Sequence, residues 1–156
     1  MRVIRAARTT DREDLVRMRV ALWPDSQEGE VDGLLAMPPT EGAVLVAEAE
    51  GTGLDGFAEV GVRTFADGCA SSPVAYLEGI WVDASARRSG IAAALVGEAE
   101  TWARSAGLVE LASDCEVDNV ASQAFHRAVG FEEVQRSVCF RRDLTVRGPG
   151  SGRRPA

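Results

Sequence analysis

The sequence predicts an α+β domain in which a single sheet carries helices on its faces. Two observations predict this class. Three apolar stretches with strand character follow one another at residues 44–49, 57–65 and 74–82. Helical patterns lie before and after this group, most clearly over residues 90–106. Consecutive strands with helices on either side of them in the chain are typical of an α+β layout with a largely antiparallel sheet.

The N-terminal part is expected to form a short strand over residues 2–6 and then two helices. Thr10 to Glu13 have the pattern of a capping box, which opens a helix. Apolar residues then recur at helical spacing as far as Leu22, and the helix ends there because the residue before Pro24 avoids the helical region. A second, shorter helix is expected to end before Pro38.

The central strands are separated by polar and glycine-rich segments. A turn rich in glycine at residues 51–56 reverses the chain between the first two strands, and a polar loop at residues 67–72 leads into the third. Gly79 lies near the middle of this third strand, where an isolated glycine indicates a bulge.

The C-terminal part is predicted to be a helix over residues 90–106, a strand over 108–113, a second helix over 119–129 and a final strand over 131–144. On the second helix the alanines and Phe125 are expected to face the core, which leaves His126 away from it. We therefore expect one domain over residues 1–144. Residues 145–156 have no core-forming pattern and are expected to be a disordered tail.

Composition is that of a globular protein, with 46% apolar and 26% charged residues in a chain of 156. No apolar run is long enough to span a membrane, and the first residues lack the pattern of a signal peptide, so we expect a cytoplasmic protein with no membrane partner. The three cysteines are irregularly spaced and there is one histidine, so we expect reduced thiols and no metal site.

The charge is strongly negative. The net charge of −7 becomes −10 for residues 1–144, because three arginines belong to the tail. Such a field repels nucleic acid and concentrates cations, which favours a positively charged substrate and disfavours a nucleic-acid partner. The alternative is that the excess charge serves only solubility.

The most informative motif is the run Arg87-Arg88-Ser89-Gly90-Ile91-Ala92, which follows a strand and precedes the long helix. A helix N-terminus binds anions because its first N–H groups have no partner and the helix dipole favours negative charge. Small residues at positions 90 and 92 let a phosphate approach the backbone. The alternative is an ordinary helix start with two solvated arginines.

Two motifs together resemble the GNAT N-acetyltransferase superfamily. Arg87-x-x-Gly90-x-Ala92 is similar to its acetyl-CoA loop, and residues 119–131 are similar to the helix that follows its fifth strand. Ser122 stands at the small residue of that helix, and His126 stands where the superfamily usually has tyrosine. The resemblance covers about residues 2 to 144 and implies the GNAT acyl-CoA N-acyltransferase fold, with one mixed, mostly antiparallel sheet and acetyl-CoA as co-substrate.

The resemblance also implies where acetyl-CoA lies. The fourth and fifth strands splay apart in this fold, and the pantetheine arm enters the V between them. Backbone groups of Ile80, Trp81 and Val82 would pair with the arm, and Asn119 and Ser122 would face it. The pyrophosphate would lie on the loop residues, which are Arg87, Arg88, Ser89, Gly90, Ile91 and Ala92.

Five segments resemble the aminoglycoside 6'-N-acetyltransferases in particular. They are residues 19–24, 56–59, 72–82, 110–114 and 118–126. This resemblance implies a polycationic amine substrate, and relatives of this kind often form dimers through their terminal strands, so we expect a homodimer.

The substrate pocket implied by this resemblance contains carboxylates that attract ammonium groups. Glu78, Asp114 and Glu116 are the candidates, and Trp23 would form a wall that stacks on a sugar ring. Three alternatives remain open: an ion pair between Glu78 and an arginine, a solvated loop around Glu116, and a core position for Trp23.

The expected chemistry is direct transfer in a ternary complex. Glu78 or Asp114 would take a proton from the ammonium, since a protonated amine has no lone pair with which to attack. His126 is a candidate donor of a proton to the leaving thiolate, and a solvent-facing helical histidine is the alternative. Two other functions fit the same motifs: acetylation of a protein N-terminus, polyamine or metabolite, and acetyl-CoA binding without catalysis.

Overall fold

A computed structural model describes residues 2–145. Five strands form one sheet in the order β1-β2-β3-β4-β5, in which β4 and β5 are parallel and the other neighbours are antiparallel. The strands are β1 (Ile4–Ala6), β2 (Gly42–Glu48), β3 (Leu54–Arg63), β4 (Val74–Val82) and β5 (Leu111–Ser113). The α-helices are α1 (Arg12–Leu22), α2 (Glu28–Leu35), α3 (Ile91–Ser105) and α4 (Val120–Ala128).

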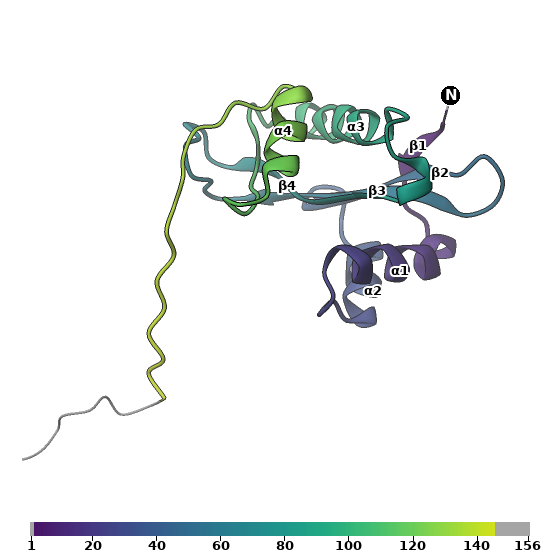
Figure 1. The fold of residues 1–156 in the computed structure, drawn as a ribbon, viewed down its shortest axis with the longest axis horizontal. Helices are drawn as coiled ribbons and strands as arrows, with labels where there is room; N and C mark the ends of the chain where they lie inside the picture. The colour runs from purple at the N-terminus through teal and green to yellow at the C-terminus, as the bar shows by residue number, and fades with distance from the viewer. Residues whose placement is uncertain (1, 146–156) are drawn as a thin grey trace, which may run out of the picture.

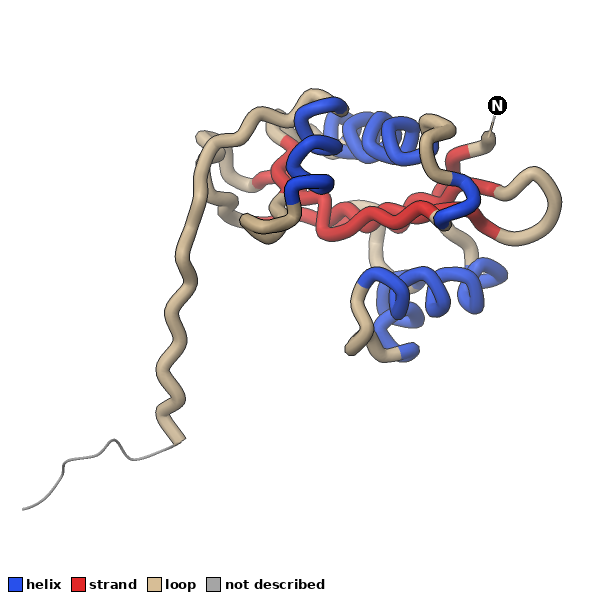
Figure 2. Tube along the Cα trace, viewed as in Figure 1, coloured by secondary structure: helices blue, strands red, loops and turns tan. Residues whose placement is uncertain are grey.

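The helices cover both faces of the sheet, as Figures 1 and 2 show, with α1 and α2 on one face and α3 and α4 on the other. On the α3 face, fully buried Leu95 and Ala99 belong to one apolar cluster with Leu77 of β4. On the opposite face, Met18 of α1 belongs to a second cluster with Phe57 of β3. The predicted α+β class, the mixed sheet and the two helical layers are confirmed.

The start of α1 differs from the prediction. A 3-10 turn over Thr9–Asp11 precedes the helix, and the predicted capping box from Thr10 is not formed. The Asp11 carboxylate instead accepts hydrogen bonds from the Arg8 backbone N–H at 2.7 Å and from the Arg5 guanidinium at 2.7 and 3.0 Å. The turn points Asp11 back toward β1, where a charged partner outcompetes the helix amides.

The bulge predicted at Gly79 is present. Glu59 of β3 pairs with Gly79, whereas the next residue, Val60, pairs with Leu77, so Glu78 is the extra residue of β4. A side chain could not replace the hydrogen of Gly79, because a Cβ atom there would lie 2.3 Å from two ring atoms of Trp23. The bulge therefore brings Gly79 against Trp23, the residue that ends α1, while Glu78 pairs with Arg63 of β3.

The V-shaped gap between β4 and β5 is also present. The parallel pairing joins Ala75–Leu77 to Leu111–Ser113 and then stops, while β4 continues to Val82. Within the described chain, no strand pairs with that edge of residues 78–82. The gap leaves backbone N–H and C=O groups available to an extended ligand.

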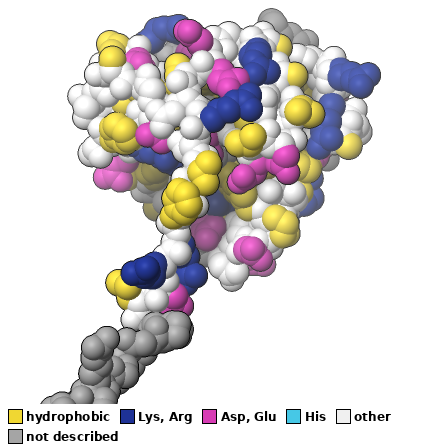
Figure 3. Space-filling model, turned by 60° about the vertical axis from the view of Figure 1, so that its left-hand side comes forward, with side chains coloured by type: hydrophobic (Ala, Val, Ile, Leu, Met, Phe, Trp, Pro, Cys, Tyr) yellow, Lys and Arg dark blue, Asp and Glu magenta, His cyan; other side chains and the backbone are white. Residues whose placement is uncertain are grey.

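The predicted strand at residues 131–144 is wrong for this structure. Residues 132–144, here called the arm, have no regular secondary structure and leave the body of the molecule, as Figures 1 and 2 show. Figure 3 shows the arm as a narrow stalk that carries hydrophobic and charged side chains. A strand forms only where another strand can pair with it, and among residues 2–145 the arm has no such neighbour.

The predicted tail, residues 145–156, lies outside the described residues except for Thr145. Among the described helices, none is both long and apolar enough to cross a membrane.

Candidate active site

The turn between β4 and α3 has the geometry that the sequence predicts. Arg88 and Gly90 adopt left-handed backbone conformations, with φ of 61° and 82°, and the Ser89 hydroxyl donates to the Ala86 carbonyl at 2.5 Å. Within the described chain, the backbone N–H groups of residues 90–93 have no hydrogen-bond acceptor. The turn therefore presents a row of free donors at a helix N-terminus, which is an anion site.

A cavity of about 400 Å³ lies beside this turn, between α3 and α4. Its lining includes Val82, Arg87, Gly90 and Ala92 from the turn side and Phe125 from α4. A Cβ atom built on Gly90 would meet no atom within 4 Å, so the space over the turn is open. Free amides, two arginines and an open cavity together fit a diphosphate and the start of a pantetheine chain.

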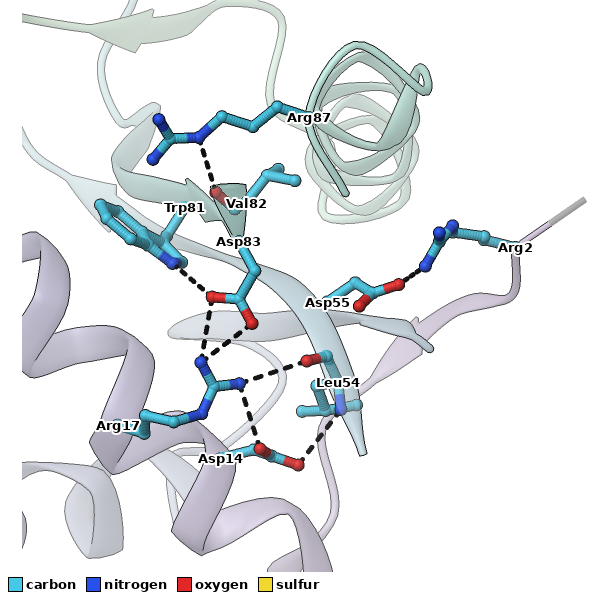
Figure 4. A network of polar contacts seen from close by, with 9 residues as sticks. All are labelled: Arg2, Asp14, Arg17, Leu54, Asp55, Trp81, Val82, Asp83 and Arg87. Carbon is cyan, nitrogen blue, oxygen red and sulfur yellow. Dashed lines mark hydrogen bonds and ion pairs between the residues drawn. The ribbon is translucent and has the colours of Figure 1, made fainter. Parts of the chain in front are cut away.

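Figure 4 shows the polar network that holds the end of β4. Asp83 accepts hydrogen bonds from the Trp81 indole at 2.9 Å and from Arg17 of α1 at 2.9 and 3.0 Å. Burial alone would raise the pKa of Asp83, but these donors outweigh it and hold the pKa below its ordinary value. Arg87 Nε donates to the Val82 carbonyl at 3.0 Å, so this carbonyl is occupied by the protein itself.

The division of α4 into a buried face and a face that carries His126 differs from the prediction. The Asn119 side chain accepts a hydrogen bond from the Ser122 N–H at 3.0 Å and is the N-cap of α4. His126 is half-buried rather than solvent-facing, and its ring lies between those of Phe125 and Phe131, at 5.6 and 5.2 Å. The predicted core-facing stripe forms only in part: Phe125 packs against the main apolar cluster, whereas the three alanines of the stripe, Ala121, Ala124 and Ala128, are exposed.

Both ring nitrogens of His126 have protein partners. Nδ1 lies 2.7 Å from the Ser122 carbonyl oxygen, to which it can only donate, and Nε2 lies 2.9 Å from the Ser113 hydroxyl. The Ser122 contact places a proton on Nδ1 and holds that nitrogen to the backbone. Nε2, which lies against the Ser113 hydroxyl, is the nitrogen left to exchange a proton.

The structure brings Glu78 and Asp114 into one cluster of four residues, here called the acceptor cluster: Arg63, Tyr76, Glu78 and Asp114. Arg63 donates to both oxygens of Glu78, at 2.8 and 2.5 Å, and its guanidinium lies 3.5 Å from the centre of the Tyr76 ring. The Tyr76 hydroxyl donates to Asp114 Oδ1 at 2.5 Å. The ion-pair alternative for Glu78 is thus what the structure contains.

Trp23 closes one side of this region. Its ring covers Gly79 of the bulge, stacks edge-to-face on Phe57 at 6.4 Å, and lies 4.9 Å below the Arg19 guanidinium. Arg19 is in turn held by Glu59. Trp23 is half-buried, so the core and pocket interpretations both describe part of its surface. Glu116 is exposed and its side chain has no hydrogen bond within the described residues.

Sequence reasoning missed four residues of this region, namely Arg19, Glu59, Arg63 and Tyr76. The signal for two of them was present on β3, where Glu59 and Arg63 are four residues apart and therefore lie on one face. Their partners on α1 and β4 depend on register, which the pattern did not specify.

Glu59 is the most perturbed carboxylate of this region. Only 7% of the residue is exposed, and Arg19 donates to its Oε1 at 2.8 Å. Burial raises its pKa from the ordinary value of 4.5 to about 7, although Arg19 opposes this shift. The folded protein therefore holds a proton near neutral pH that the unfolded chain releases.

We expect this proton to make stability fall as pH rises from about 4.5 to 7, because a raised folded-state pKa stabilises the fold only below it. In Glu59→Gln, urea unfolding at pH 5 and pH 7 should show this fall reduced by on the order of 1 to 3 kcal/mol. The exposed Glu41→Gln is the control. Equal pH slopes in wild type and Glu59→Gln would contradict the assignment.

The comparisons with known proteins agree with this geometry. The model of the acetyltransferase (GNAT) family matches residues 10–131. The chain is 43% identical to aminoglycoside N(6')-acetyltransferase type 1 of Klebsiella aerogenes, over 91% of this chain and 97% of that protein. It is 41% identical to the protein of the same name from Stenotrophomonas maltophilia, over 90% and 93%.

Solved structures give the same result. The aminoglycoside 6'-N-acetyltransferase AAC(6')-Ih of Acinetobacter baumannii superposes with a TM-score of 0.85 at 33% identity, covering 92% of this chain and 99% of that one. AAC(6')-Iy, in complex with the bisubstrate analogue CoA-S-monomethyl-acetylneamine, has the same TM-score, identity and coverage. With its open amide turn, its β4–β5 gap and these relatives, the chain belongs to the GNAT acetyltransferase family.

Proposed function

We propose that this protein transfers the acetyl group of acetyl-CoA to the 6'-amino group of an aminoglycoside antibiotic, in a ternary complex. The observation that carries the proposal is that β4 connects the two halves of the site. Its end leads into the turn with free backbone amides, and its bulge carries Glu78 of the acceptor cluster. The named activity of relatives at 41% and 43% identity supports the choice of substrate.

For acetyl-CoA, the proposal assigns the diphosphate to the N–H groups of the turn, with Arg87 and Arg88 adding charge. The open edge of Ile80, Trp81 and Val82 would pair with the pantetheine amides through its remaining backbone groups, since the Val82 carbonyl already accepts from Arg87. Acetyl-CoA supplies the activated acyl group. The proposal retains Asn119 and Ser122, at the N-terminus of α4, as residues that would face the pantetheine arm. Backbone N–H groups at the bulge would polarise the thioester carbonyl.

For the acceptor amine, Asp114 is our choice of general base. Arg63 occupies both oxygens of Glu78, whereas Tyr76 occupies only Oδ1 of Asp114 and leaves Oδ2 without a partner in the described chain. Asp114 takes a proton from the substrate ammonium, and the freed lone pair attacks the thioester carbon. The C–S bond of the resulting tetrahedral intermediate then breaks, the nitrogen gives up its second proton to solvent to leave the amide, and the thiolate takes up a proton from solvent or from His126.

Glu78 is then the anchor for a second ammonium group of the same substrate, with Trp23 as the wall that contacts a sugar ring. Glu116, exposed beyond Asp114, would contribute charge at the entrance. The net charge of −10 over residues 1–144 supports a polycationic substrate and no nucleic-acid partner. The cytoplasm is the proposed location, since acetyl-CoA is available there.

A thiol-release assay with acetyl-CoA tests the function directly. Kanamycin and tobramycin should release coenzyme A, and NMR of the product should show the acetyl group on the 6' nitrogen. Peptides with free N-termini and spermidine are the comparison amines. Turnover of those amines without turnover of the antibiotics would favour the other acetyltransferase function, and acetyl-CoA binding without any turnover would favour a binding module.

We also propose a homodimer in which each arm adds a strand beside β5 of the other copy. β5 is the edge of the sheet formed by the described residues, so its outer backbone groups have no strand partner among them. Val134, Val138, Phe140 and Leu144 of the arm are 58 to 93% exposed and all lie at even positions, so they would share one face of a strand. An apolar face of this kind requires cover.

Light scattering after gel filtration measures the oligomer. We expect wild type to have the mass of a dimer, and a chain that ends at residue 131 to have the mass of a monomer. The double variant Val138→Asp and Phe140→Asp should weaken the dimer without shortening the chain. A dimer that persists in both altered chains would rule out the arm as its basis.

A further inference from the structure

Arg63 occupies the position where an ammonium group of the proposed substrate would bind. It stands at the end of β3 and makes a two-pronged ion pair with Glu78, at 2.8 and 2.5 Å. Its guanidinium lies 3.5 Å from the centre of the Tyr76 ring. A carboxylate on one side and an aromatic face on the other are the two surfaces that best bind an organic cation.

We infer that Arg63 is an internal occupant of the cation subsite, which a polycationic substrate must displace from Glu78 before it binds productively. The inference rests on the proposed function, because it concerns the same pocket. Arg63 is then a specificity-determining residue: it competes with the substrate for Glu78 and takes no part in the acetyl transfer.

The exposure of the pair supports displacement. The side chains of Arg63 and Glu78 are 45% and 34% exposed, and Glu78 is the only carboxylate that pairs with Arg63 in the described chain. Exposed ion pairs contribute little net free energy, since water and salt compete with them, although a two-pronged pair such as this one is stronger than a single contact. Both side chains are open to solvent, so another cation can compete with Arg63 for Glu78.

A second arginine–glutamate pair from the same region shows the contrast. Arg19 and Glu59 are 10% and 9% exposed, and Arg19 also contacts Glu30 and the Ser26 hydroxyl. Arg19 is thus held by three side chains, is nearly buried, and has a structural role. Arg63 is held by Glu78 and the Tyr76 ring but is far more exposed than Arg19, so competing cations can reach its partner.

The exchange has a consequence for selectivity. Glu78 is neutralised by Arg63 before the substrate binds and by an ammonium group afterwards, so a single ammonium gains little by displacing Arg63. A substrate with several ammonium groups gains additional contacts at Asp114 and in the negative field, which compensate for the lost pair. Arg63 therefore favours polycations over monoamines.

Steady-state kinetics of Arg63→Gln with tobramycin tests the inference. We expect KM for tobramycin to fall by about three- to fivefold, the upper range for an exposed ion pair, with kcat nearly unchanged. Arg104→Gln is the matched control: it removes the same charge from an exposed pair on α3, where Arg104 is bonded to Glu100. An unchanged or higher KM in Arg63→Gln, or an equal fall in Arg104→Gln, would overturn the inference.

A double-mutant cycle tests whether Arg63 acts through Glu78. Glu78→Gln should raise KM for tobramycin. In that background, adding Arg63→Gln should not lower KM, because the carboxylate for which Arg63 competes is gone. If Arg63→Gln lowers KM equally with and without Glu78, displacement from Glu78 is wrong. Thermal unfolding of each variant checks that the fold is retained.

Calorimetry with tobramycin separates this inference from the proposed function. Tighter binding of tobramycin to Arg63→Gln than to wild type, with no turnover by wild type, would refute the proposed function but support the displacement of Arg63. Turnover by wild type with no tightening in Arg63→Gln would refute the displacement and retain the function.

Discussion

Replacing Gly90 with glutamate is expected to lower the affinity for acetyl-CoA by about a hundredfold or more. The backbone N–H groups of residues 90–93 are free of protein acceptors, and the space above Gly90 is open. A carboxylate at this position would occupy that space and repel the diphosphate. Calorimetric titration with acetyl-CoA measures the change.

Two control variants separate charge from backbone strain. Gly90 has φ of 82°, so Gly90→Ala introduces a conformational cost of about 1 kcal/mol for a side chain in the left-handed region. It adds no charge, so it reports the effect of backbone strain alone. Gly97→Glu adds the same charge on α3 at a position with equally open space. We expect both controls to retain most of the affinity. Wild-type affinity in Gly90→Glu would remove the turn from the diphosphate site.

Replacing Asp114 with asparagine is expected to lower kcat by about 100- to 10,000-fold, the usual effect of losing a general base. The amide oxygen can still accept the hydrogen bond from Tyr76, so the acceptor cluster should keep its geometry. Affinity for acetyl-CoA should not change, because our proposal assigns Asp114 to the acceptor amine and not to the cofactor. Single-turnover kinetics with saturating tobramycin measure the chemical step.

Asp118→Asn is the control for this substitution, since it makes the same chemical change in an exposed side chain four residues further along the chain. Its kcat should stay close to that of wild type. A wild-type rate in Asp114→Asn, together with a large loss of kcat in Glu78→Gln, would transfer the role of base to Glu78.

The predictions that succeeded concern features set by neighbours in the chain. The spacing of Leu95 and Ala99 on α3, the glycine at position 90 and the bulge at Gly79 are readable because local sterics and helical periodicity determine them. The turn between β4 and α3 is formed by a strand end, a glycine and a helix start, and these are consecutive in the sequence.

The predictions that failed depend on distant partners. The capping box from Thr10 to Glu13 is replaced by a 3-10 turn whose Asp11 pairs with Arg5. The alanines of the predicted α4 stripe have no core cover, and the arm has a strand-like pattern without a strand to pair with among the described residues. A periodic pattern specifies which face of a strand is apolar, but its pairing partner can belong to another part of the chain or to another chain.

Local sequence thus determined the class of the fold, the free-amide turn and the positions of the acidic residues, because each follows from short-range backbone geometry and side-chain chemistry. The tertiary structure alone decided that Arg63 reaches Glu78 fifteen positions away, and that Tyr76 reaches Asp114 across the β4–β5 pair. Both contacts follow from strand register and one inserted residue at the bulge. Register is a long-range property, since it is set by the packing of whole strands rather than by any residue with its neighbours.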